Sequence, residues 1–207
     1  ISPYAVCGNN PLFIMDSKGD SLTLLGARTD INSAIEIYNK GLGGFYTVSA
    51  NDNGNLSIQA VDGTDPSKMS PSQKAVSEKL KTIIDNEGNT ILNVTNNSEG
   101  TLIGDISKHE IDVGDMQKLE NQKELNDVSS IMHETYENYQ VQVLNSNINY
   151  AHRKASELEY RITGYFIPPF ERDIESNSLK LHVLIPSDYY KYIRPKGDCP
   201  WQADAAA

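Results

Sequence analysis

The chain has 207 residues, of which 38% are hydrophobic, and a formal net charge of −10 at pH 7. That length suffices for one large domain, or for one domain with an appendage, and a mean hydropathy of −0.48 indicates a rather polar globular protein. The acidic balance argues against binding to nucleic acid or to an anionic membrane surface, because both require clustered Lys and Arg. No apolar run in the sequence approaches the roughly 20 residues of a membrane-spanning helix.

Turn-forming residues dominate the first twenty positions, which predict an irregular segment with one short strand at residues 12–15. From position 21 the composition becomes that of a globular domain. We therefore expect an appended segment at 1–20 and a domain at 21–204. Cys7 and Cys199 lie near opposite ends of the chain. We expect free thiols, the alternative being a disulfide that joins the termini.

Hydrophobic periodicity predicts two helices and a hairpin in the first half of this domain. The first helix has Asp30 as its N-cap and ends at the glycines of residues 41–44. The second helix starts at Ser70-Pro71, with proline in the first turn, and continues to about Asp85. The run Asp52-Asn53-Gly54 is typical of a hairpin turn. Strands are predicted at 45–49, 55–61, 90–95, 102–106, 109–113 and 179–185.

A pair of helices is predicted in the second half, after a polar and charged segment, 115–125, that reads as a surface loop. Asn126 or Asp127 is the expected N-cap of the first helix, which residues 145–147 interrupt. The second helix runs over residues 149–162 with one apolar face. The expected fold class is therefore α+β, with an antiparallel sheet and a helix pair.

The stretch 130–137, Ser-Ile-Met-His-Glu-Thr-Tyr-Glu, points to chemistry. In a helix, His133 and Glu137 lie one turn apart on one face, with Glu134 beside them. The pattern differs from the zinc-peptidase signature H-E-x-x-H by a glutamate at the last position, and a carboxylate oxygen also binds zinc. His152, on the neighbouring helix, is the expected third ligand. The sequence thus predicts a Zn²⁺ site formed by His133, Glu137 and His152.

A zinc hydrolase needs three protein ligands, a coordination position for water, and a base. Glu134 is the predicted base: it would take the proton of the zinc-bound water and pass it to a leaving amine. Glu159 lies two turns from His152 and is predicted to hold the second ring nitrogen of a ligand histidine. His109 and His182 fall in strand patterns and are expected to be structural. We place an extended peptide substrate along the strand at 109–113.

The first twenty residues carry a resemblance to a known family. The pattern Ser2-Pro-Tyr-x-x-Cys7-x-Asn9-Asn10-Pro11, followed by Asp16-x-x-Gly19, resembles the end of the core of Rhs/YD-repeat proteins. The resemblance implies that residues 1–20 close a shell of tandem repeats and that a variable C-terminal effector follows. Such effectors are often toxins that bacteria deliver to competing cells, so a secreted or cell-surface fragment of a larger exported protein is expected, with a cognate immunity protein as a partner.

The second half carries a further resemblance. His133-Glu-x-x-Glu137, followed by Ala151-His152 and Glu159, resembles the zincin-like metallopeptidase domains found at Rhs-type C-termini. It implies a zincin-like active-site helix pair with the ligands and base named above. The expected function is that of a zinc-dependent metallopeptidase acting on a protein or peptide. Two alternatives stay open: a non-catalytic or degenerate zincin-fold binding domain of an Rhs-associated surface protein, and another toxin chemistry such as a nuclease, which the acidic balance disfavours.

Overall fold

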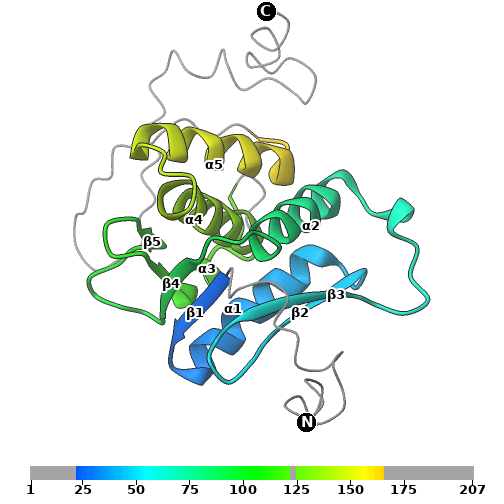
Figure 1. The fold of residues 1–207 in the computed structure, drawn as a ribbon, viewed down its shortest axis with the longest axis horizontal. Coiled ribbons are helices and arrows are strands. Elements are labelled where there is room, and N and C mark those ends of the chain that lie inside the picture. The colour runs from blue at the N-terminus through cyan, green and yellow to red at the C-terminus, as the bar shows by residue number, and fades with distance from the viewer. Residues whose placement is uncertain (1–21, 122–124, 166–207) are drawn as a thin grey trace, which may run out of the picture.

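The structure is a computed structural model that describes residues 22–121 and 125–165, so the predictions for residues 1–20, the strand at 179–185, His182 and both cysteines lie outside it. The described part is a mixed α/β fold with five α-helices and two sheets (Figure 1). The helices are α1 (Arg28–Leu42), α2 (Pro71–Ile84), α3 (Val113–Gln117), α4 (Asp127–Gln142) and α5 (Ile148–Thr163). The strands are β1 (Leu22–Gly26), β2 (Tyr46–Ala50), β3 (Leu56–Ala60), β4 (Thr90–Thr95), β5 (Gly104–Asp105) and β6 (Glu110–Asp112).

The larger sheet has the strand order β1-β4-β6-β5 and is mixed. Strand β4 pairs in parallel with both β1 and β6, and only β5 runs antiparallel to its neighbour β6. The prediction of an antiparallel sheet is therefore wrong for this sheet and right for the β2–β3 hairpin. The physical reason is the connection between β1 and β4: it contains α1, the hairpin and α2, and such a crossover returns the chain in the same direction.

Local signals placed most helix ends correctly. Ser70 forms a capping box with Gln73 at the start of α2, and Pro71 stands at N1, as predicted. Gly43 closes α1 in the left-handed conformation. The start of α1 was predicted three residues late: Ala27 is the N-cap, and Asp30 lies in the first turn, where its charge suits the helix dipole.

Two elements differ from expectation. The segment predicted as a surface loop at 115–125 begins within a helix, α3, which Asp112 caps by accepting a hydrogen bond from the Asp115 amide. Met116 within α3 and Leu119 just after it are buried. The helix was not predicted because it is too short to show a hydrophobic periodicity. Strand β1 was not predicted at all, and the strands expected at 102–106 and 109–113 shorten to β5 and β6.

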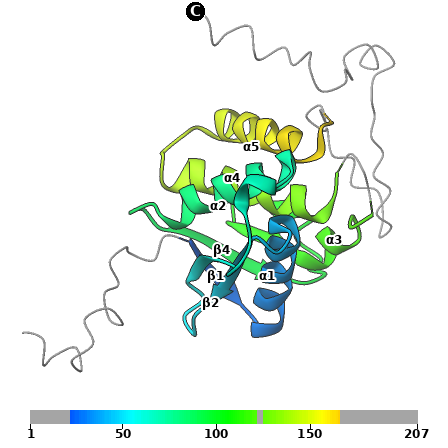
Figure 2. The same ribbon diagram turned by 90° about the vertical axis from the view of Figure 1, so that its right-hand side faces the viewer.

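Helix α4 lies between α5 and the four-stranded sheet, as both views of the ribbon show (Figures 1 and 2). It buries Ile131 and Met132 completely in the hydrophobic core. It also buries a row of polar and ionisable side chains: Ser129, His133, Glu134, Glu137 and Asn138. Burying such groups is costly unless they are paired, and in enzymes they mark sites of chemistry. In the part of the chain that the structure describes, no helix has the length and apolar character needed to span a membrane.

Candidate metal centre

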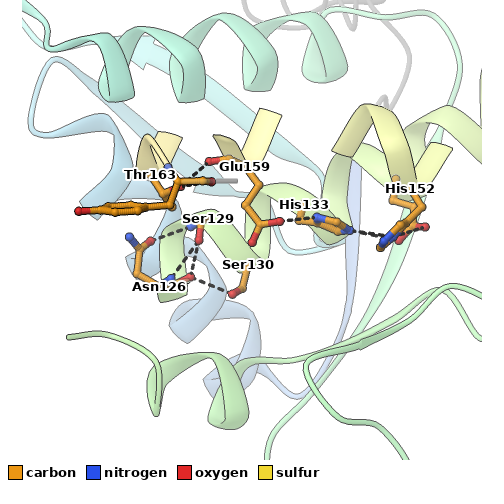
Figure 3. A network of polar contacts seen from close by, with 9 residues as sticks. Asn126, Ser129, Ser130, His133, His152, Glu159 and Thr163 are labelled. Carbon is orange, nitrogen blue, oxygen red and sulfur yellow. Dashed lines mark hydrogen bonds and ion pairs between the residues drawn. The ribbon is translucent and has the colours of Figure 1, made fainter. Parts of the chain in front are cut away.

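The three predicted ligands meet at one point between α4 and α5. His133 Nε2 lies 3.2 Å from His152 Nδ1 and 3.8 Å from Glu137 Oε2. His152 Nδ1 lies 3.3 Å from Glu137 Oε1. One donor atom from each residue falls within 4.8 Å of the others. Figure 3 shows the imidazoles of His133 and His152 facing each other across the two helices.

The local sequence explains this convergence. His133 and Glu137 are one turn apart on α4, so their side chains project on the same side of the helix. Asn147 caps α5 by accepting a hydrogen bond from the Tyr150 amide, which sets the start of that helix and hence the position of His152. Ala151 and Ala155 on α5 are fully buried, and small side chains there allow the two helices to approach closely.

Glu159 lies behind His133, on the side away from His152. Its Oε2 is 3.0 Å from His133 Nδ1, and both side chains are buried (Figure 3). A carboxylate is an acceptor, so Nδ1 of His133 carries a proton and donates it to Glu159. The unprotonated Nε2 of the neutral ring then faces Glu137 and His152. This pairing selects the tautomer that a metal ion requires.

Three carboxylates control the charge of His133. Burial lowers the pKa of its imidazole, but the hydrogen bond and charge of Glu159, together with the charges of Glu134 and Glu137, outweigh burial and raise the pKa to about 9. In the metal-free protein the ring is therefore cationic at neutral pH. The same negative charges would favour a bound metal cation in place of that proton.

The donor set fits zinc. Two imidazole nitrogens and one carboxylate oxygen are established zinc ligands, and with bonds of about 2.0–2.1 Å the donors of a tetrahedral centre stand roughly 3.3 Å apart. The two imidazole nitrogens are 3.2 Å apart, close to that spacing, and each lies within 4 Å of one Glu137 oxygen: Oε1 is 3.3 Å from His152, and Oε2 is 3.8 Å from His133. The site also has an open side: the side chain of His152 is 43% exposed, whereas those of His133 and Glu137 are 11% and 7% exposed.

Glu134, the predicted base, projects from the neighbouring face of α4 and is buried. Its carboxylate packs against Gly104 of β5, so closely that a Cβ atom at position 104 would overlap it. A side chain at position 104 would therefore have to displace the Glu134 carboxylate. The negative charge of Glu134 contributes to the raised pKa of His133, which indicates that its carboxylate lies near the donor cluster.

The structure contradicts one placement and adds residues that the sequence did not reveal. Strand β6 lies between β4 and β5 and is paired on both sides, so it cannot accept a peptide as an added strand, and the substrate position predicted at 109–113 is wrong. Among the described strands, β5 forms that edge of the sheet. The sequence patterns did not identify Asn138, which contacts His109, or Gly104, which packs against Glu134. Only Asn138 could have been found from the sequence, because it lies one helical turn after Glu134.

Comparison of the chain with protein-family models, with curated proteins and with solved structures yields no match. The resemblance to Rhs-type proteins and to zincins therefore stays a prediction from short motifs. What the described residues establish is a mixed α/β fold and a largely buried group, His133, Glu137 and His152, that could hold a metal ion.

Proposed function

We propose that this domain is a zinc-dependent metallopeptidase in which His133, Glu137 and His152 bind the metal and Glu134 is the general base. The observation that carries the proposal is the convergence of three donor atoms within 4.8 Å from two helices. The Glu159 carboxylate behind His133 supports it, because histidines that bind a metal usually donate their other ring N–H to a carboxylate or a carbonyl.

Zinc supplies a Lewis acid that polarises a carbonyl group and lowers the pKa of water. The other steps belong to side chains of this protein. The Glu134 carboxylate accepts the proton of the attacking water and delivers it to the leaving amine. Glu159 keeps His133 in the ligating tautomer. The exposed ring of His152 marks the side from which a substrate reaches the site.

The substrate in this proposal is a protein or peptide bound in extended form beside β5. This strand is the edge of the larger sheet among the described residues, and its Gly104 packs against Glu134. An extended peptide that pairs with such an edge presents successive carbonyl groups along α4. This placement replaces the one at residues 109–113.

The biological setting is also a proposal. The motif at residues 2–19 supports an Rhs-type bacterial protein in which residues 21–204 are the C-terminal effector, exported as a toxin and neutralised by a cognate immunity protein. The metallopeptidase chemistry suits such a role, because hydrolysis of a target protein needs only zinc and water besides the target itself.

The direct test is metal analysis of the purified protein combined with the variant Glu134→Gln. We expect about one zinc per chain, removable by a chelator, and hydrolysis of fluorescently labelled casein that stops on zinc removal and returns on its addition. Glu134→Gln should keep the zinc and lose roughly 10²- to 10⁴-fold in rate, the usual contribution of a general base.

Three other results would be equally decisive. A protein without stoichiometric zinc, whose activity or toxicity is equal with and without Glu134, contradicts the proposal. Stoichiometric zinc with no hydrolysis by the unaltered protein supports the alternative, a non-catalytic domain that uses the same fold for binding. Iron in place of zinc would also contradict it, since two histidines and one carboxylate also form the ligand set of iron oxygenases.

A further inference from the structure

The turn between β5 and β6 contacts the active-site helix through His109. This residue has a left-handed backbone, with φ of +52°. Histidine adopts that conformation more often than most residues, although it is uncommon for any residue except glycine. The backbone carbonyl of His109 accepts a hydrogen bond from the Asn93 amide at 2.7 Å. Its ring nitrogen Nδ1 lies 2.9 Å from Oδ1 of Asn138 on α4.

Backbone groups determine the direction of the hydrogen bonds around Asn138, which is completely buried. The carbonyl of Glu134 can only accept, so the amide nitrogen Nδ2 of Asn138 donates to it at 2.9 Å. Oδ1 of Asn138 therefore faces His109, and the proton between them belongs to Nδ1 of the histidine.

The neighbouring glutamine agrees with this assignment. The Ile91 amide donates to Oε1 of Gln142 at 2.9 Å, so Nε2 of Gln142 is the donor to Oδ1 of Asn138 at 3.1 Å. Oδ1 thus accepts two hydrogen bonds and every donor in the group has an acceptor. In its neutral form His109 must therefore be protonated on Nδ1 and unprotonated on Nε2.

The same hairpin also contacts the side chain of Glu134. Gly104 of β5 packs against its carboxylate, while His109 reaches its backbone carbonyl through Asn138. Glu134 and Asn138 are one turn apart, on the face of α4 next to the one that carries His133 and Glu137. The hairpin therefore approaches the proposed base and not the face that carries these ligands.

We propose that His109 is a positioning residue for Glu134, an inference that rests on the proposed role of Glu134 as the base. Its bond to Asn138 holds the β5–β6 hairpin against α4. The hairpin in turn keeps Gly104 against the Glu134 carboxylate and restricts its rotation. Loss of the ring contact lets the carboxylate rotate, while the proposed zinc ligands keep their places between α4 and α5.

The test variant is His109→Asn in the full chain. Asparagine also tolerates the left-handed backbone but is too short to keep the contact with Asn138. Zinc affinity should stay within about twofold, and peptide hydrolysis should lose roughly 10- to 100-fold in kcat with little change in KM, as for a misplaced catalytic group. If this variant folds poorly, His109→Gly removes the ring and relieves the backbone strain.

Two spectroscopic measurements do not depend on activity. Nitrogen-15 spectra of the unaltered protein should show neutral His109 protonated on Nδ1. The carboxyl carbon-13 resonance of Glu134, assigned with Glu134→Gln, should shift in His109→Asn. The matched control is Lys108→Gln: Lys108 lies in the same turn and contacts Gly100 and Asp105 rather than α4, so that variant should leave the resonance and kcat unchanged.

The outcomes separate this inference from the proposed function. An unchanged Glu134 resonance in His109→Asn overturns the positioning role, whether or not the protein hydrolyses peptides. So does protonation of the neutral ring on Nε2, or an equal loss of kcat in Lys108→Gln. A shifted resonance in a protein that cleaves no peptide retains the structural link between His109 and Glu134 but refutes the peptidase.

Discussion

His133 Nδ1 lies 3.0 Å from Glu159 Oε2, a buried contact between two residues that are 26 positions apart in the sequence. It links α4 to α5 and determines which nitrogen of His133 faces the other proposed ligands. The contact thus connects the packing of two helices to the protonation state of one ring. The first two predictions follow from it.

Replacing Glu159 with glutamine should weaken zinc binding roughly 10- to 100-fold, the usual cost of removing a carboxylate behind a ligating histidine. Glutamine has nearly the same shape but is neutral, so it supports the ligand less strongly. The measurement is competition with a chromogenic chelator at constant pH. Glu157→Gln on the same helix is the control, because Glu157 pairs with Lys154 and not with the site. Equal affinities for the two variants would contradict the role of Glu159.

The metal-free protein should lose stability as the pH rises from neutral towards 9. The pKa of His133 in the folded protein, about 9, lies above its ordinary value of 6.5. Its contribution to the free energy of unfolding is therefore fully present below about pH 6.5 and lost as the pH passes through about 9. Thermal unfolding with a chelator present measures this loss. The variant His133→Gln should lack this component, and an identical pH dependence in both proteins would refute the charged pair.

Gly104→Ala should impair catalysis far more than it impairs folding or zinc binding. The new methyl group would overlap the Glu134 side chain, which is not part of the backbone and would have to move aside. Displacing the base should lower kcat roughly 10- to 100-fold. Steady-state kinetics, metal analysis and the melting temperature measure the three properties. Gly100→Ala is the control, since a Cβ there meets only an ordinary contact with Lys108. A fully active Gly104→Ala protein would show that the Glu134 position is not critical.

Tyr38→Phe should destabilise the fold by about 0.5–1.5 kcal/mol, the usual net contribution of one buried hydrogen bond. The Tyr38 hydroxyl lies 2.7 Å from Oγ1 of Thr135, which donates its own proton to the Ile131 carbonyl, so the tyrosine is the donor. This bond ties α1 to α4. Urea denaturation measures the change, and Thr135→Ser, which keeps a hydroxyl, should cost less. A neutral Tyr38→Phe would contradict the assignment.

Short-range chemistry made much of this protein predictable. The prolines and capping residues placed α2 and α4, the left-handed glycines marked the ends of α1 and α5, and the hairpin turn identified β2 and β3. The proposed zinc ligands could also be named, because His133 and Glu137 are one helical turn apart and His152 opens the next helix. Each of these signals lies within a few residues of the feature that it predicts.

Long-range packing decided the rest. Strand β1 pairs in parallel with β4, 68 residues later in the register Leu22 to Thr90, and no local pattern shows that two distant segments will share a ladder. This pairing turned the expected antiparallel sheet into a mixed one. The short helix α3 forms where Met116 can be buried, which depends on neighbours that come from elsewhere in the chain.

The candidate site divides in the same way. The sequence by itself determined which side chains of α4 could hold a metal ion, since helical spacing places His133 and Glu137 together before any tertiary contact forms. Only the tertiary structure decided that Gly104 packs against Glu134 and that His109 reaches α4 through Asn138. Ligand spacing is a property of one helix, whereas the position of the proposed base depends on how a sheet edge packs on that helix.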